Sequence, residues 1–220
     1  MSATSGRGQP SIVLARHGRP DLPADLARPI SGRDIGRWYE RYDRLGIAAD
    51  DMPAALREAL AAAPCVVTSD ARRAIETAAR AVDPDRVRIE PGLGEVSFPA
   101  SISMPVRLSP NTMVLLARAF QMARWCACDE PVPATRARAA TAAATLSRLA
   151  EAHGWLVFVG HGWFNRFVAR ELRRHGWRGP QWLPTGYWST ATYTRSGASG
   201  DSPRPASCVA ASLDHDLRGG

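Results

Sequence analysis

Residues 11–18 read SIVLARHG, a short apolar run followed by an arginine, a histidine and a glycine. Apolar runs of this length that follow Gly- and Pro-rich sequence are typical of buried strands. In an open α/β sheet, the residues that follow such a strand lie in the crevice where ligands bind. Neutral imidazole is a good nucleophile, and a guanidinium binds phosphate through two parallel hydrogen bonds. The stretch therefore predicts a strand that delivers Arg16 and His17 to a phosphate-binding crevice.

A second stretch, residues 66–79, reads VVTSDARRAIETAA and repeats this arrangement. The short apolar run predicts a strand, and Ser69 or Asp70 is expected to cap the helix that follows. Arg72 and Arg73 then fall in the first turn of that helix, where backbone N–H groups and the helix dipole favour an anion. Two cationic side chains are thus predicted at the start of one helix.

A third stretch, residues 155–163, reads WLVFVGHGW and ends a strongly apolar run at His161. This histidine precedes a helical segment that we expect from residue 163 to 174. The carboxyl ends of parallel strands meet at one edge of a sheet, so the three stretches are expected to converge there. Together they outline a phosphate pocket.

The order of the expected elements indicates the fold class. Strands are expected at 11–15, 65–68, 86–90, 155–159 and near 188–194, and helices within 34–62 and at 70–82, 110–127, 133–153 and 163–174. Alternating strands and helices predict an α/β three-layer sandwich, with a mostly parallel central sheet flanked by helices on both faces. We expect a flexible segment over 1–10, a single domain over 11–200 and a partly ordered tail over 201–220.

Composition narrows the functional classes. The chain has 220 residues, 45% of them hydrophobic, and a net charge of +7. All 28 of its positively charged side chains are arginines, because lysine is absent. The positive field favours an anionic substrate, but no basic patch with interleaved aromatic residues indicates nucleic-acid binding. No apolar run has the length of a membrane span or of a signal peptide, and four cysteines without a disulfide pattern favour a cytoplasmic protein. Cys126 and Cys128 lack the spacing of zinc or redox pairs, so no metal is expected.

The motifs together resemble the histidine phosphatase superfamily, which includes the cofactor-dependent phosphoglycerate mutases. The resemblance rests on RHG at 16–18, on the pattern SxxxRAxxTA at 69–78 and on VGHG at 159–162. LGEVSF at 93–98 is similar to the segment that carries the acidic residue of that family. The motifs span roughly residues 11–170 in the order of the family.

The resemblance implies a role for each matching residue. His17 would take the phosphoryl group and become a phosphohistidine, and Glu95 would be the general acid that protonates the leaving oxygen and then activates water. His161 would be the third catalytic residue, and the substrate-binding residues would be Arg16, Gly18 and Arg73. Arginines and a second imidazole can stabilise the transferred group, so the resemblance implies a small phosphorylated substrate and no metal or other cofactor.

The sequence also departs from the mutases of this family. Pro23 stands where they have an asparagine, and Pro99 replaces the glycine that usually follows the acidic residue. These differences favour a metal-independent phosphohydrolase that acts on a small phosphate ester. A phosphoglycerate-mutase-like phosphotransferase and a non-catalytic domain that binds phosphate or phosphoproteins remain as alternatives.

Two Pro- and Arg-containing inserts, 21–46 and 99–131, are candidates for a lid that shapes the substrate. In the second insert we expect an apolar core stripe formed by Met113, Leu116, Phe120, Ala123 and Ala127. Candidate contacts to a second anion are Arg19, Arg33 and Arg107. His153 and His175 follow helical patterns and precede glycines, so they are expected at helix C-termini. Arg72 is expected to be a solvated neighbour of Arg73.

Overall fold

A six-stranded sheet lies at the centre of the structure, a computed structural model that describes residues 9–126 and 128–195. Its strands are β1 (Ser11–Arg16), β3 (Val66–Thr68), β4 (Val87–Ile89), β6 (Trp155–Gly160), β7 (Trp177–Arg178) and β8 (Thr190–Arg195). In the spatial order β4-β3-β6-β1-β8-β7, the first four strands run parallel and each of the last two is antiparallel to the strand before it. The prediction of a mostly parallel sheet is confirmed.

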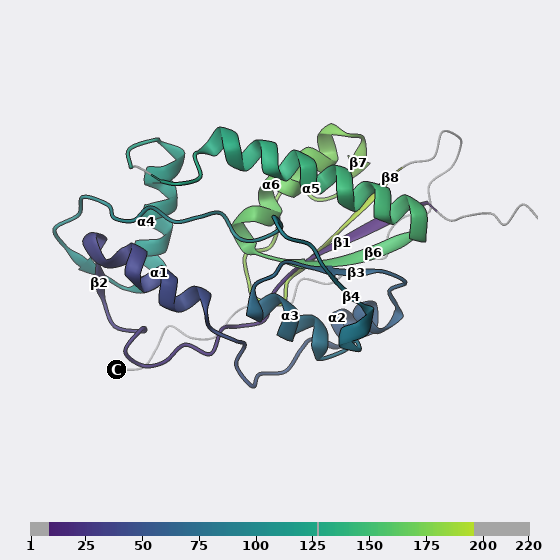
Figure 1. Ribbon diagram of the computed structural model, residues 1–220, viewed down its shortest axis with the longest axis horizontal. Helices are drawn as coiled ribbons and strands as arrows, with labels where there is room; N and C mark the ends of the chain where they lie inside the picture. Colours follow the sequence, from purple (N-terminus) through teal and green to yellow (C-terminus); the bar gives the residue numbers. More distant parts are fainter. Residues whose placement is uncertain (1–8, 127, 196–220) are drawn as a thin grey trace, which may run out of the picture.

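Helices cover both faces of this sheet (Figure 1). On one face lie α2 (Ala54–Ala62) and α3 (Arg72–Ala79), and on the other lie α5 (Val132–His153) and α6 (Gly162–Arg174). Each face buries its own apolar cluster, with Leu60 and Ala78 on the first side and Leu146 and Leu172 on the second. The predicted three-layer arrangement is therefore confirmed.

The register of the parallel strands brings their carboxyl ends to the same level. Arg16 of β1 pairs with Gly160 of β6, and Thr68 of β3 pairs with Val159 of β6. The next residue in each strand connection is therefore His17, His161 or Ser69. The central strand β6 is apolar throughout because helices cover it on both sides, and this is why its sequence has no alternation.

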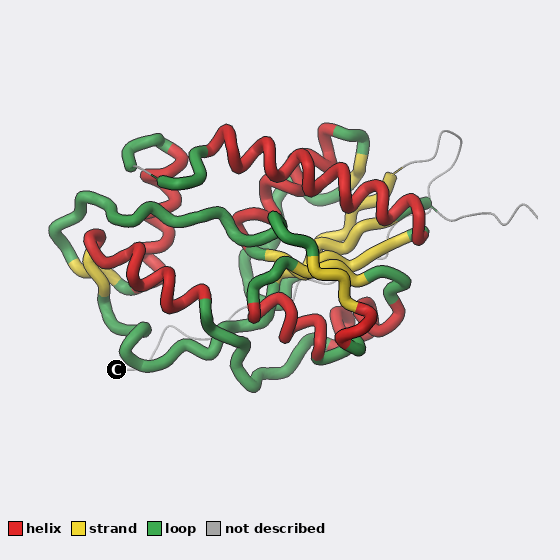
Figure 2. Tube along the Cα trace, in the orientation of Figure 1, coloured by secondary structure: helices red, strands yellow, loops and turns green. Residues whose placement is uncertain are grey.

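The two inserts pack against each other in a lobe beside the sheet. The lobe contains α1 (Ile35–Asp43), α4 (Pro110–Met122) and a two-stranded ribbon of β2 (Ile30–Ser31) and β5 (Arg107–Leu108). Its own apolar cluster includes Ile35, Trp38 and Met113. Figure 2 shows that loops join the lobe to the sheet.

Several predicted boundaries are wrong. The helix expected at 70–82 is α3, which begins at Arg72 after an extended Ala71, because the hydroxyl of Ser69 bonds to a histidine instead of capping a helix. The helix expected at 110–127 ends at Met122, and Arg124 then takes a positive φ of 61° that no helix accommodates. The two-residue strands β2, β5 and β7 were not predicted. Single-turn 3₁₀ helices occur at Gly32–Asp34 and Pro84–Arg86. The expectations for residues 1–8 and 201–220 lie outside the described residues.

The stripe predicted on α4 is also wrong in register. The buried residues of α4 are Pro110, Met113, Ala117, Arg118 and Gln121. Of the predicted stripe, Leu116 and Phe120 are half-buried, Ala123 is exposed, and Ala127 lies outside the described residues. The stripe shifts because Arg118 and Gln121 turn inward and donate hydrogen bonds to backbone carbonyls of the loop at 96–97.

Candidate active site

His17, directly after β1, is buried and held in one tautomer. Its Nδ1 lies 2.8 Å from the carbonyl oxygen of Gly18, which can only accept, so Nδ1 carries the ring proton. Nε2 is then unprotonated, and its lone pair accepts a hydrogen bond from Nε of Arg73 at 3.3 Å. The unprotonated nitrogen therefore faces a guanidinium.

Arg73, in the first turn of α3, is itself fixed by the lobe. Its side chain is 1% exposed, and it donates to the carbonyl oxygen of Asp43 at 3.0 Å and pairs with the Asp43 carboxylate at 2.9 Å. Such a buried guanidinium is held by charge-assisted bonds rather than by water. The end of α1 thus positions a cation beside His17.

His161, directly after β6, lies next to His17, with ring centroids 5.2 Å apart. Its Nδ1 is 3.3 Å from a guanidinium nitrogen of Arg73, which can only donate, so this ring nitrogen accepts. Its Nε2 therefore carries the proton and donates to the hydroxyl of Ser69 at 2.7 Å. Arg73 thus contacts both imidazoles through different nitrogens.

Burial and positive neighbours keep both imidazoles neutral. Burial, followed by the charges of His161, Arg73 and Arg16, lowers the pKa of His17 well below its usual 6.5. Burial, followed by Arg73 and Arg16, lowers the pKa of His161 well below the same value. Each shift disfavours the charged form. At neutral pH, Nε2 of His17 is therefore unprotonated.

Arg16 is the second guanidinium at this point. It lies over the ring of Tyr187, 4.2 Å from the centroid, and donates to the carbonyl oxygen of Thr185. Its Nε is buried and has no hydrogen-bond partner among the described residues. A Cβ on Gly162 would lie 3.1 Å from this Nε, so the glycine permits the close approach. An unsatisfied buried N–H of a cation is a natural donor to an anion.

The carboxylate of Glu95 sits at the N-terminus of α6. Oε1 accepts from the backbone N–H groups of Val96 and Phe164, both at 2.9 Å, and Oε2 accepts from that of Trp163 at 3.2 Å. The helix dipole adds to these three bonds. The acid predicted from the sequence is thus anchored at the wall of the cavity that contains His17.

Gly18 is required by packing. A Cβ at this position would lie 2.3 Å from the ring of Trp188, and the Gly18 N–H donates to the hydroxyl of Thr77 at 2.9 Å. Gly18 does not line the cavity. Its substrate-binding role therefore stays a prediction, and the contacts that it makes are structural.

A cavity of about 210 Å³ joins these groups. At one end lie Arg16, His17 and Arg73, and Glu95 lies on its wall. The lobe closes the remainder with residues from α1 and α4, including Tyr42 and Arg118. The inserts therefore do cover the pocket.

Other sequence candidates lie elsewhere. Arg72 is 68% exposed and pairs with Glu76, which confirms that it is a solvated neighbour. Arg19, Arg33 and Arg107 are exposed and do not line this cavity, but Arg19 lines a second cavity that shares four residues with it. His153 and His175 are exposed at the ends of α5 and α6, as predicted.

Sequence reasoning missed several residues of the site. Ser69, Asp43 and Tyr187 contact the central arginines and histidines, and Arg118 and Arg166 line the cavity. Only Ser69 had a signal, because a polar residue directly after a buried strand faces the same edge as the histidines.

Within residues 9–126 and 128–195, no helix has both the length and the apolar character needed to cross a bilayer. No cluster of three or more histidine, cysteine or acidic side chains with metal-binding geometry occurs in the same ranges.

The fold and the site define an α/β protein with a cavity lined by arginines and a histidine at the carboxyl edge of its sheet. The chain belongs to the histidine phosphatase superfamily (branch 1), whose family model matches residues 12–201. No curated protein matches the chain significantly.

Solved structures share the fold at low identity. The product of open reading frame Rv3214 of Mycobacterium tuberculosis is 18% identical with a TM-score of 0.51, over 83% of this chain and 89% of that one. A phosphoserine phosphatase of Entamoeba histolytica in complex with phosphoserine is 14% identical with a TM-score of 0.52, over 83% of this chain and 89% of that one. The structure of that phosphatase with 3-phosphoglyceric acid is 15% identical in sequence with a TM-score of 0.51, over 86% of this chain and 98% of that one.

Proposed function

We propose that the protein is a metal-independent phosphomonoesterase that acts on a small phosphate ester through a phosphohistidine at His17. The observation that carries this proposal is the tautomer of His17. Its Nδ1 bonds to the Gly18 carbonyl, so the lone pair of Nε2 faces Arg73 in the cavity. A buried, neutral and oriented imidazole is what nucleophilic attack on phosphorus requires.

In the first step, the Nε2 lone pair of His17 attacks phosphorus and the bond from phosphorus to the ester oxygen breaks. Glu95 in its acid form gives a proton to that oxygen, so the alcohol leaves. In the second step, the Glu95 carboxylate takes a proton from water, whose oxygen attacks phosphorus. The bond to Nε2 then breaks, its electron pair returns to the imidazole, and orthophosphate leaves.

Charge stabilisation comes from groups that are already in place. Arg16 offers its unsatisfied Nε, Arg73 contacts both imidazoles, and His161 is fixed by Ser69. Phosphoryl transfer needs mainly positioning and electrostatic stabilisation, which two guanidiniums can supply without a metal ion. We therefore expect a chelator to leave the rate unchanged.

The test is His17→Ala with a panel of phosphate monoesters. Turnover should fall to background, and labelled substrate should leave an acid-labile, base-stable adduct on the wild type alone. His153→Ala is the matched control, because this histidine is exposed at the end of α5 and should tolerate the change. Wild-type turnover in the His17 variant would refute the proposal. Incubation with 3-phosphoglycerate and its bisphosphate would reveal a mutase.

A further inference from the structure

Aromatic rings line much of the cavity, from the residues beside Arg16, His17 and Arg73 outward. Six take part: Trp38, Tyr39, Tyr42, Phe98, Trp163 and Tyr187. The rings of Tyr39 and Phe98 stack with centroids 4.2 Å apart, and those of Trp38 and Tyr42 stack at 5.0 Å. Stacking fixes the rings in place before any ligand arrives. The wall is therefore preformed and rich in aromatic faces.

Several polar side chains also line the cavity, but most of them are already paired within the protein. Arg118 donates to the carbonyls of Val96 and Ser97, Glu95 accepts three backbone N–H groups, and the carbonyl of Thr185 accepts from Arg16. Asn111 and Arg166 are the other polar side chains at this wall. Burial raises the pKa of Tyr39, so its phenol stays neutral. A leaving group with several hydroxyls would lose hydrogen bonds to water and find few replacements here.

We propose that this aromatic wall is a leaving-group subsite for an aromatic alcohol, so that the preferred substrates are phosphate monoesters that carry an aryl ring near the ester oxygen. The inference rests on the proposed function and names its substrate class. A second cavity of about 400 Å³ shares Trp38, Tyr42, Asn111 and Tyr187 with the first. It provides room for a leaving group longer than one ring.

The test compares ligands whose leaving alcohols have similar basicity. The value of kcat/KM for 2-phenylethyl phosphate should exceed that for propyl phosphate and for glycerol 3-phosphate at least tenfold. Calorimetry with the non-hydrolysable 2-phenylethylphosphonate and propylphosphonate should show the same order of affinity. Tyr39→Ala should reduce the aryl preference severalfold, whereas Trp182→Ala, which changes an 83% exposed ring outside the cavity, should not.

The outcomes separate this inference from the proposed function. Turnover of all esters with no aryl preference would overturn the subsite and leave the phosphatase intact. Aryl preference in phosphonate binding without any turnover would support the subsite and refute the catalytic proposal. A preference that Tyr39→Ala leaves unchanged in a folded protein would also overturn the subsite.

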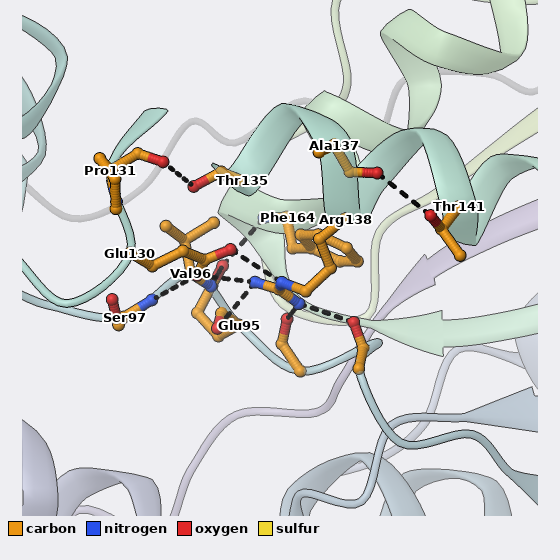
Figure 3. A network of polar contacts seen from close by, with 12 residues as sticks. Glu95, Val96, Ser97, Glu130, Pro131, Thr135, Ala137, Arg138, Thr141 and Phe164 are labelled. Atoms are coloured by element: carbon orange, nitrogen blue, oxygen red, sulfur yellow. Dashed lines mark hydrogen bonds and ion pairs between the residues drawn. The ribbon is translucent and has the colours of Figure 1, made fainter. Parts of the chain in front are cut away.

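A second inference rests on a different observation, the polar network around Arg138 of α5 (Figure 3). Its guanidinium uses all five N–H groups. It pairs with both oxygens of Glu130 at 2.8 and 2.9 Å, and donates to the carbonyls of Gly92, Gly94 and Glu95 at 2.7, 2.8 and 3.4 Å. The ring of Phe164 lies beneath it at 4.0 Å. Arg138 thus binds the loop that carries Glu95 through three of its carbonyls.

Glu130 and Arg118 also bind this loop. Glu130 also accepts from the backbone N–H of Ser97, at 3.2 Å. Arg118 donates to the carbonyls of Val96 and Ser97 at 2.7 and 2.9 Å. The carbonyls at positions 92, 94, 95, 96 and 97 are therefore all bonded to arginine side chains.

We infer that Arg138 and Glu130 are positioning residues that hold Glu95 against the N-terminus of α6. The inference rests on the proposed role of Glu95 as general acid. Lysine at position 138 keeps the charge but has no planar fork with five donors, so it cannot bridge Glu130 and three carbonyls. A displaced acid slows departure of an alkoxide, but departure of nitrophenolate needs no proton.

Arg138→Lys should therefore lower kcat for an alkyl phosphate at least tenfold and kcat for nitrophenyl phosphate less than threefold. Glu130→Gln, a milder change, should also lower the ratio of kcat for the alkyl phosphate to kcat for nitrophenyl phosphate. Arg136→Lys is the matched control, because this arginine is exposed on α5 two residues away and should be silent. Melting temperatures establish that each variant is folded.

Equal losses on both substrates, or none, in folded Arg138→Lys would overturn the positioning role. This holds provided that Glu95→Gln itself discriminates between the two leaving groups. If Glu95→Gln does not discriminate, the acid assignment fails instead, and the positioning role inferred for Arg138 and Glu130 fails with it.

Discussion

At the candidate site, the hydrogen bond at one ring nitrogen of each histidine decides which nitrogen carries the proton. The Gly18 carbonyl fixes the proton of His17, and the Ser69 hydroxyl fixes that of His161. The sequence placed both histidines correctly, because a strand followed by a polar residue is a local pattern. It did not indicate Asp43, which reaches Arg73 from a separate insert and has no local signature.

Arg73 and Arg72 are adjacent in sequence but differ in surroundings, so they form a matched pair. Arg73 is 1% exposed and contacts both imidazoles, whereas Arg72 is 68% exposed. We expect Arg73→Lys to lower kcat/KM by ~10²-fold or more, since lysine cannot reproduce the geometry of the guanidinium. Arg72→Lys should leave kcat/KM unchanged. The reverse pattern would show that the assignment is off by one residue.

Glu95→Gln tests the acid while keeping the size of the side chain. Protonation by a positioned group is typically worth about 10²–10⁴-fold in rate. We expect a loss in this range on alkyl phosphates and a much smaller loss on nitrophenyl phosphate. Steady-state kinetics on both substrates check this result. An equal loss on both would indicate that Glu95 acts instead in hydrolysis of the phosphohistidine or in capping α6.

At the scale of elements, the five predicted strands and the helices α5 and α6 followed the sequence pattern, but α4 did not. Its predicted stripe assumed that apolar residues face inward, yet Arg118 and Gln121 are buried because the loop at 96–97 offers them carbonyl acceptors. Such a partner lies far away in sequence, so periodicity alone cannot reveal it. The ends of α5 and α6 were predictable, since glycines with positive φ follow both.

The end of α5 offers a clean test of this local rule. Gly154 has a φ of +85° and no atom within 4 Å of an added Cβ, so Gly154→Ala changes conformational energy without a clash. We expect the free energy of unfolding to fall by about 1 kcal/mol. Gly186→Ala is the control, because its site is also open and its φ is not in the left-handed region. Denaturant unfolding of both variants measures the difference.

At the scale of the whole molecule, the layers and the direction of the strands were predictable, because alternating elements leave few alternatives. The contact between the two inserts was not predictable. It depends on an apolar cluster assembled from segments more than fifty residues apart, including Ile35 and Met113. That contact closes the cavity, so the substrate end of the site follows from tertiary packing alone.

The whole molecule also has a pH dependence that comes from its two buried imidazoles. In the unfolded chain a histidine has a pKa near 6.5, whereas burial lowers the pKa of His17 and His161 well below that value in the folded protein. Well above pH 6.5 both histidines are neutral in the folded and in the unfolded protein, so the free energy of unfolding does not depend on their protonation. As pH falls below 6.5, the unfolded chain takes up protons that the folded protein refuses, so the free energy of unfolding falls.

Between pH 7.5 and 5.5 we therefore expect a loss of about 1.4 kcal/mol for each of the two histidines. Hydrogen bonds from Ser31 and Arg37 lower the pKa of Asp34. Protonation of such carboxylates changes the free energy of unfolding only at a pH below this window. His161→Gln should halve the loss. Denaturant unfolding in phosphate-free buffer measures it, because a bound anion would favour the protonated rings. A wild-type profile that stays flat would mean that the two histidines take up protons equally in the folded and unfolded states, which would refute the lowered pKa values.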